Sequence, residues 1–180
     1  MAEALVFSRH AALLAMLVAC VYTDLAKGKI LNAVTLPALF FGLAANYALG
    51  GAMPEERLFF ESLVAMGIGG GALFVIYLFG GFGAGDVKLM AAVGALSADR
   101  HLVMWALVYT AVIGAAMAAG MLVWKGRLME GLRRSFRLLV TFRRQARDVE
   151  KKEELFLPYG FAISVGSMWA WFAMVALRGR

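Results

Sequence analysis

Two aspartates in this sequence lie next to apolar stretches, where a charged side chain is costly. Asp24 closes the first apolar stretch, and Asp86 ends the run Gly83-Ala84-Gly85-Asp86 between two further ones. A charge within a membrane segment costs several kcal/mol even on the lenient insertion scale, so such residues usually face a cavity and have a function. The two acids are therefore the first candidates for chemistry.

Two carboxyl groups that converge can act together as an acid and a base. Within hydrogen-bonding distance they do not both ionise easily, so they share a proton and titrate as a coupled unit. The charged member takes a proton from water as it attacks a peptide carbonyl, and the protonated member polarises that carbonyl and later protonates the leaving amine. This chemistry needs no metal, cofactor, or nucleophilic serine or cysteine. Asp24 and Asp86 therefore predict an aspartyl protease, in which Gly83 and Gly85 let a substrate strand approach the backbone closely.

Each aspartate also has a purely structural interpretation. Asp86 is a good helix N-cap after a glycine turn, because an aspartate there pairs with free backbone N–H groups. Asp24 is explained equally well as an interface residue paired with Lys27. The two acids taken together, with the glycine run between apolar stretches, favour the catalytic interpretation.

The composition predicts an integral membrane protein. Hydrophobic residues make up 62% of the 180, charged residues only 17%, and the mean hydropathy is +0.76, which is too apolar for an ordinary soluble domain. We expect an all-α, polytopic bundle of about six transmembrane helices forming one membrane domain over residues 1–180, since a span needs about 20 residues. The apolar segments are residues 4–22, 32–49, 59–79, 87–98, 102–124 and 156–177. The fourth is short, so five spans are the alternative.

The basic residues are distributed unevenly between the two sides of the predicted bundle. With the N-terminus outside, one side holds Lys27, Lys29, Lys88 and ten Lys or Arg residues between 125 and 152, and the other side holds five arginines. Positive charge gathers in cytoplasmic loops, so both aspartates are expected at the cytoplasmic face. Because the basic residues flank membrane segments, we predict no nucleic-acid partner despite the net charge of +6.

The segment 125–154 is the one long hydrophilic stretch of the sequence. Most of its arginines fall off a stripe of apolar residues that recur at helical spacing, namely Leu128, Leu132, Phe136, Leu139 and Phe142. We expect an amphipathic helix at the cytoplasmic membrane interface, attracted to anionic lipid. A solvated helix or a flexible loop is the alternative.

Three short blocks carry a resemblance to a known family. GAGDVKL at 83–89 contains G-x-G-D followed by the family's D-[VI]-K-L continuation. DLAKGKILN at 24–32 is similar to an aspartate followed by a basic residue and I-P-N, with Leu31 in place of the proline. PYGFAI at 158–163 is similar to P-Y-G-P-A-I, with Phe161 in place of the second proline. In this order the blocks resemble the type IV prepilin leader peptidases, membrane aspartyl proteases of the G-x-G-D type, over nearly the whole chain.

The resemblance implies an enzyme of the bacterial inner membrane that cuts the cytoplasmic-side leader of a prepilin just ahead of its hydrophobic stretch. It implies catalytic roles for Asp24 and Asp86. It also implies an active-site loop or substrate-binding role for Gly83, Gly85, Lys88, Pro158, Tyr159 and Gly160. For Lys88 the alternative is anchoring at the membrane interface, and for 158–160 it is the start of a helix, where proline is common.

Larger members of this family carry a cytoplasmic domain with paired cysteines, which binds zinc and N-methylates the trimmed pilin. This sequence has one cysteine, Cys20, so neither an internal disulfide nor a multi-cysteine zinc site can form from it. We therefore expect no metal and proteolysis without methylation. In this the sequence resembles the short members that serve Flp-type, or tight-adherence, pili.

Two other classes of function stay open. Intramembrane proteases of the presenilin or signal-peptide-peptidase type share G-x-G-D, but in them a tyrosine directly precedes the first aspartate, whereas Thr23 separates Tyr22 from Asp24 here. A non-enzymatic transporter or assembly subunit would use Asp24 and Asp86 as a proton or cation site. The substrate distinguishes the first alternative, and coupled flux without cleavage distinguishes the second.

Overall fold

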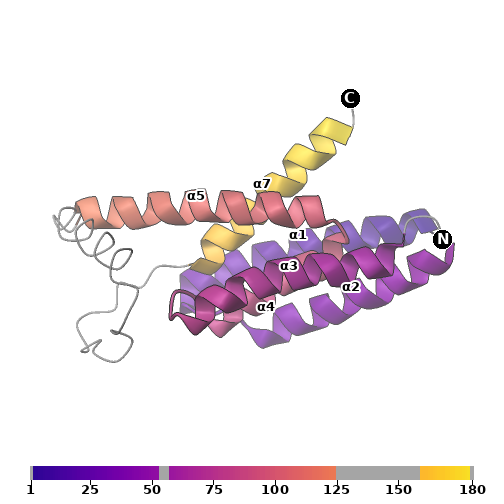
Figure 1. The fold of residues 1–180 in the computed structure, drawn as a ribbon, viewed down its shortest axis with the longest axis horizontal. Coiled ribbons are helices and arrows are strands. Elements are labelled where there is room, and N and C mark those ends of the chain that lie inside the picture. The colour runs from indigo at the N-terminus through magenta and orange to yellow at the C-terminus, as the bar shows by residue number, and fades with distance from the viewer. Residues whose placement is uncertain (1, 53–56, 125–158, 179–180) are drawn as a thin grey trace.

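The computed structural model describes residues 2–52, 57–124 and 159–178, and over these residues the chain forms six α-helices and no strand (Figure 1). The helices are α1 (Ala2–Lys27), α2 (Asn32–Ala52), α3 (Leu58–Leu78), α4 (Ala84–Ser97), α5 (Arg100–Trp124) and α7 (Tyr159–Arg178). The predicted all-α helix bundle is confirmed for this part of the chain. The predicted amphipathic segment 125–154 and Pro158 lie outside the described residues.

The helices differ in whether they can cross a bilayer. In the described ranges, α1, α2, α3 and α5 are long and apolar enough to do so. Helix α7 is apolar over the shorter range Tyr159–Val175, and α4 has only 14 residues. The bundle is therefore that of a multi-pass membrane protein, and its fourth segment is as short as the sequence suggests.

The short helix α4 is the most deeply buried element, and glycines bring its neighbours close. A Cβ on Gly94 of α4 would lie 2.5 Å from the backbone of Ala65 in α3. A Cβ on Gly42 of α2 would lie 2.8 Å from the backbone of Ala95 in α4. Small residues let membrane helices approach closely, and α4 therefore packs tightly between α2 and α3. This packing fixes the position of Asp86 in the first turn of α4.

Helix α1 continues past the end of its apolar stretch and includes Asp24. It ends at Lys27, where Gly28 takes a positive φ of 62° and donates its N–H to the Asp24 carbonyl over 2.9 Å. A glycine adopts this left-handed conformation without the strain a side chain would add, so it commonly ends a helix. Hydropathy alone placed the end near residue 22, because the polar last turn carries no apolar signal.

Helix α4 begins earlier than the apolar pattern predicts, at Ala84 in place of residue 87. Gly83 occupies the N-cap position, and its N–H donates to Asp86 Oδ2 over 2.8 Å. Asp86 is thus the third residue of the helix, so the interpretation of Asp86 itself as the N-cap is wrong. Its carboxylate still satisfies a backbone donor at the helix start, as in a capping box.

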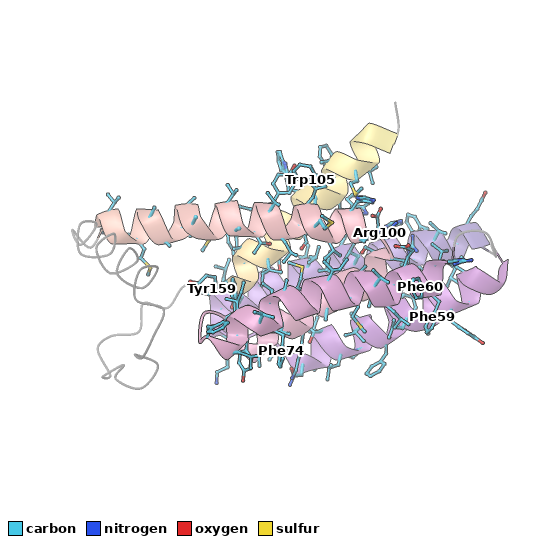
Figure 2. The ribbon with its side chains drawn as sticks, viewed as in Figure 1. Phe59, Phe60, Phe74, Arg100, Trp105 and Tyr159 are labelled. Atoms are coloured by element: carbon cyan, nitrogen blue, oxygen red, sulfur yellow. The ribbon has the colours of Figure 1, made fainter. Side chains whose placement is uncertain are left out.

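Successive helices run in opposite directions through the bundle (Figure 1). The C-terminal end of α1 and the N-terminal ends of α2, α4 and α7 therefore meet at one end, which we call the aspartate end. Tyr159 lies toward this end, whereas Phe59 and Phe60 lie toward the other (Figure 2). Helix α7 begins at the aspartate end and crosses the other helices obliquely, and its C-terminal part extends away from them (Figure 1).

Candidate active site

Asp24 lies in the last turn of α1 and faces the start of α7. Its side chain is 5% exposed, and Oδ2 accepts the backbone N–H of Phe161 over 2.9 Å. A Cβ on Gly160 would lie 2.9 Å from the Asp24 carboxyl group, so this close approach requires glycine. The first N–H groups of a helix have no partner within the helix and carry partial positive charge. Asp24 therefore supplies an acceptor to the N-terminus of α7, a helix 137 residues further along the chain.

Asp86 occupies the equivalent electrostatic position on α4. It is 8% exposed and accepts the Gly83 N–H through Oδ2, while its own N–H donates to the Gly83 carbonyl over 3.1 Å. Both candidate acids thus accept a backbone N–H from the start of a helix, where negative charge is favoured; for Asp24, in the last turn of α1, that helix is α7. The glycines beside the two acids, Gly85 and Gly160, also contact the same side chain, that of Ile30.

Ile30 connects the three sequence blocks at the aspartate end. Its Cβ lies 3.1 Å from the position of a Cβ on Gly85, and its Cδ1 lies 2.8 Å from the position of a Cβ on Gly160. The two glycines that flank the acids therefore contact one side chain from the loop after α1. Ile30 was missed as a candidate site residue, although the similarity of the block at 24–32 to the family pattern includes it.

Two other predicted site residues, Lys88 and Tyr159, lie near the aspartates but contact other residues in the structure. Lys88 Nζ donates to Asn32 Oδ1 over 3.1 Å at the exposed surface, which connects α4 to the start of α2. The rings of Tyr159 and Phe82 lie 4.7 Å apart, which connects α7 to the loop before α4. Phe82 is a further residue that the motif analysis left out, whereas Asn32 belongs to the block at 24–32 but was given no role in the site. Pro158 lies outside the described residues.

One structural alternative from the sequence, the pairing of Asp24 with Lys27, can be compared with these contacts. Within the described part of the chain, Asp24 forms no salt bridge with Lys27, and the ion pair that is present joins Glu61 and Arg100 at the other end. Among the same residues, no group of three or more His, Cys, Asp or Glu side chains is placed to hold a metal ion. The acids thus have backbone donors as their hydrogen-bond partners.

The chain matches the model of the type IV leader peptidase family over residues 11–123, which is more than half of its length. It belongs to this family. The protein is accordingly an aspartic peptidase of the prepilin-peptidase type and not a non-enzymatic transporter. Comparisons with curated proteins and with solved structures gave no match.

The matched region of this leader peptidase contains both aspartates but stops before α7. The third block, which includes Tyr159 and Gly160, is therefore connected to the site by its position in the structure. Gly160 packs closely against the Asp24 carboxyl group, and the Phe161 backbone N–H donates a hydrogen bond to it.

Proposed function

We propose that Asp24 and Asp86 form the catalytic pair of this peptidase. The observation that supports the proposal is that two buried carboxyl groups lie at one end of the bundle, and each accepts a backbone N–H from the start of a helix. The hydrogen bonds observed engage Oδ2 of each residue. We assign the two Oδ1 atoms to the reaction, because they are the oxygens that these backbone bonds leave to water and substrate.

In the proposed reaction, one carboxylate accepts a proton from the attacking water. The other carboxyl group starts protonated, donates its hydrogen bond to the scissile carbonyl oxygen, and then gives its proton to the leaving amine. The N-termini of α4 and α7 stabilise the single negative charge that the pair carries before water attacks and again after the leaving amine has taken its proton; between these steps the charge is on the tetrahedral intermediate. The backbone bonds to Phe161 and Gly83 orient the carboxyl groups during these transfers.

We further propose that the scissile bond belongs to the leader of an Flp-type prepilin and that the site works at the cytoplasmic face of a bacterial inner membrane. Lys27, Lys29 and Lys88 lie on helices and loops of the aspartate end, in agreement with the positive-inside rule. The 180 residues contain one cysteine, the buried Cys20. This supports proteolysis without N-methylation, since that activity is associated with paired cysteines in the larger members of the family.

The test is cleavage of a candidate Flp-type prepilin by wild type, Asp24→Asn and Asp86→Asn in membranes, read by gel shift and product mass. Asparagine keeps an oxygen that can accept the same backbone N–H, but it does not carry the shared proton. We expect each variant to insert normally and to lose at least about 100-fold in cleavage rate, the scale of acid–base catalysis.

The matched control is Glu61→Gln, which removes an acidic charge from α3 at the other end of the bundle. We expect it to cleave at the wild-type rate. Wild-type cleavage by either aspartate variant would exclude the two-aspartate mechanism. A methylated product N-terminus in the mass spectrum would exclude the proposed absence of methyl transfer.

A further inference from the structure

The side chain of Ile30 lies between the first turns of α4 and α7. A Cβ on Gly85 of α4 would lie 3.1 Å from Ile30 Cβ, and its three nearest neighbours would all be atoms of Ile30. A Cβ on Gly160 of α7 would lie 2.8 Å from Ile30 Cδ1. One glycine thus packs against the branch point of the side chain and the other against its terminal methyl, so Ile30 fills the space between the two helices.

Each of these glycines is close to one of the two acids. Gly85 directly precedes Asp86 in α4. The position of a Cβ on Gly160 lies 2.9 Å from both Cγ and Oδ2 of Asp24. Neither glycine has a positive φ, so close packing rather than backbone conformation accounts for glycine at both positions. A shift of Ile30 therefore displaces backbone that carries or contacts a candidate catalytic carboxyl group.

The backbone on both sides of Ile30 is fixed to a helix. The N–H of Gly28 donates to the carbonyl of Asp24 over 2.9 Å, which ties the start of this short loop to α1. The carbonyl of Leu31 accepts the N–H of Val34 over 3.0 Å, which ties its end to α2. The side chain of Ile30 is partly buried and packs against the hydrophobic core. Ile30 is therefore held in place independently of α4 and α7.

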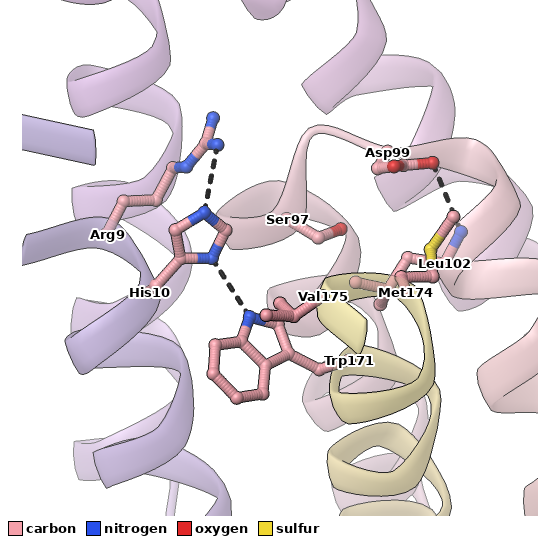
Figure 3. A pocket seen from close by; sticks show the side chains of 8 residues that line it. All are labelled: Arg9, His10, Ser97, Asp99, Leu102, Trp171, Met174 and Val175. Atoms are coloured by element: carbon pink, nitrogen blue, oxygen red, sulfur yellow. Dashed lines mark hydrogen bonds between the residues drawn. The ribbon is translucent and has the colours of Figure 1, made fainter. Parts of the chain in front are cut away.

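Helix α7 has a second attachment to α1 at the opposite end of the bundle. There Trp171 Nε1 donates to His10 Nδ1 over 3.1 Å (Figure 3). Both residues line a cavity of about 340 Å³ together with Arg9 and Asp99. Since this contact holds the far part of α7 against α1, the distance between the starts of α7 and α4 is set by contacts at the aspartate end, where Ile30 lies.

We propose that Ile30 is a positioning residue of the peptidase, which sets the distance between the starts of α4 and α7 and hence the distance between the Asp24 and Asp86 carboxyl groups. The inference rests on the proposed catalytic pair and adds the side chain that holds the pair in place. Catalytic rates depend steeply on placement, since an error of about 1 Å costs about 100-fold. Because Ile30 acts through the two helices and not on the substrate, its substitution should lower kcat and leave KM nearly unchanged.

The test is a double-mutant cycle that combines Gly85→Ala with Ile30→Val, measured as prepilin cleavage by the full chain in membranes. Gly85→Ala adds a methyl group that pushes Ile30 toward Gly160, and Ile30→Val removes Cδ1, the atom that contacts Gly160. We expect Gly85→Ala to lower kcat about tenfold in the wild-type background and no more than about threefold in the Ile30→Val background, a coupling typical of residues in contact. Additive effects would overturn the proposal.

Ile30→Val by itself removes one methyl group, so we expect it to fold and to lower kcat about threefold, with KM changed by less than about twofold. An unchanged kcat would overturn the proposal even if Gly85→Ala failed to fold. A coupling seen only in the unfolding temperature, and not in kcat per folded molecule, would assign Ile30 to packing alone and would also overturn it.

Amide hydrogen exchange gives a readout that does not depend on catalysis. Phe161 is the third residue of α7, so its N–H has no acceptor within the helix, and it donates to Asp24 Oδ2 over 2.9 Å. Gly85 lies on α4, so faster exchange at Phe161 in Gly85→Ala reports a displacement passed through Ile30 to α7. We expect exchange about tenfold faster in this variant and near the wild-type rate once Ile30→Val is added. An unaltered exchange rate in Gly85→Ala would overturn the proposal.

The matched controls are Gly67→Ala and Ile68→Val in α3. A Cβ on Gly67 meets nothing within 4 Å, and Ile68 is a partly buried side chain packed against the core. Gly67→Ala and Ile30→Val should have additive effects, and Ile68→Val should not relieve the loss caused by Gly85→Ala. Equal relief by Ile68→Val would show a general loosening of the core and would count against Ile30.

Asp24→Asn and Asp86→Asn are measured in the same assay, which separates this inference from the catalytic proposal. Loss of cleavage in both aspartate variants together with an additive cycle would overturn the role of Ile30 alone. Wild-type cleavage by either aspartate variant would overturn the catalytic pair and, with it, the role of Ile30.

Discussion

Both ends of the bundle bury charged side chains, but they combine the charges differently. The aspartate end brings together two acids of the same sign, Asp24 and Asp86, and gives each a backbone donor at a helix N-terminus. The opposite end combines Arg9 with Asp99 around one cavity and exposes the ion pair of Glu61 and Arg100. Like charges held close favour a shared proton and hence reactivity, whereas opposite charges favour binding and structure.

The largest effect is expected when the acids are changed, singly or together. In the proposed mechanism Asp24 and Asp86 act as a unit, so the double variant Asp24→Asn/Asp86→Asn should be no slower than either single variant, each reduced by at least about 100-fold. Single-turnover cleavage measures all three rates. If the loss of rate in the double variant equalled the product of the two single losses, the acids would act independently. The contrast drawn between the two ends of the bundle would then be wrong.

A smaller effect is expected from the contact between α7 and Asp24. Gly160→Ala places a Cβ within 2.9 Å of both Ile30 Cδ1 and the Asp24 carboxyl group, which should lower stability by about 1–3 kcal/mol through overpacking and displace Asp24. We expect slower cleavage and a lower unfolding temperature.

The control for this change is Gly71→Ala in α3, where a new Cβ meets nothing within 4 Å. Its stability should match or slightly exceed that of wild type, because alanine is the better helix former. An active, fully stable Gly160→Ala protein would contradict the close approach of α7 to Asp24.

At the opposite end of the bundle, we expect a substitution to lower the free energy of unfolding and to leave the cleavage rate unchanged. Asn46→Leu removes side-chain bonds to Arg9, Ser62 and the Ala95 carbonyl, so we expect a loss of about 1–3 kcal/mol in the free energy of unfolding. Cleavage per folded molecule should stay near the wild-type rate. Thermal unfolding and active-enzyme titration separate the two quantities.

Ala48→Leu, at an exposed position two residues further on, introduces the same side chain without breaking these bonds and is the control. If Asn46→Leu abolished cleavage in protein that remained folded, the two ends would be coupled, and the contrast drawn between them would fail.

The smallest effect is expected at Lys88, whose bond to Asn32 is exposed. Lys88→Met should change stability and cleavage by no more than about 1 kcal/mol, or about fivefold in rate, as for exposed polar pairs. The exposed Lys29→Met at the same end serves as the comparison in the same two assays. A loss as large as that of the aspartate variants would give Lys88 a direct role in the reaction.

The features that the sequence predicted well are local. Apolar segments identified all six described helices, because burial in a bilayer demands long apolar runs. The boundaries were less accurate at polar helix ends. Helix α1 extends to Lys27 and α4 starts at Ala84, since a turn of helix held by Gly28 or by the Asp86 side chain depends on backbone conformation and hydrogen bonding, which hydropathy does not measure.

The sequence by itself determined the membrane class, the family and the two candidate acids, because composition and short motifs carry these signals. Only the tertiary structure decided that Ile30 lies against Gly85 and Gly160, that the start of α7 donates to Asp24, and that Arg9, Asp99 and Trp171 share a cavity. These contacts join residues far apart in the chain. They follow from how glycines let particular helices approach, and helix packing depends on the complementarity of whole surfaces that no single segment encodes.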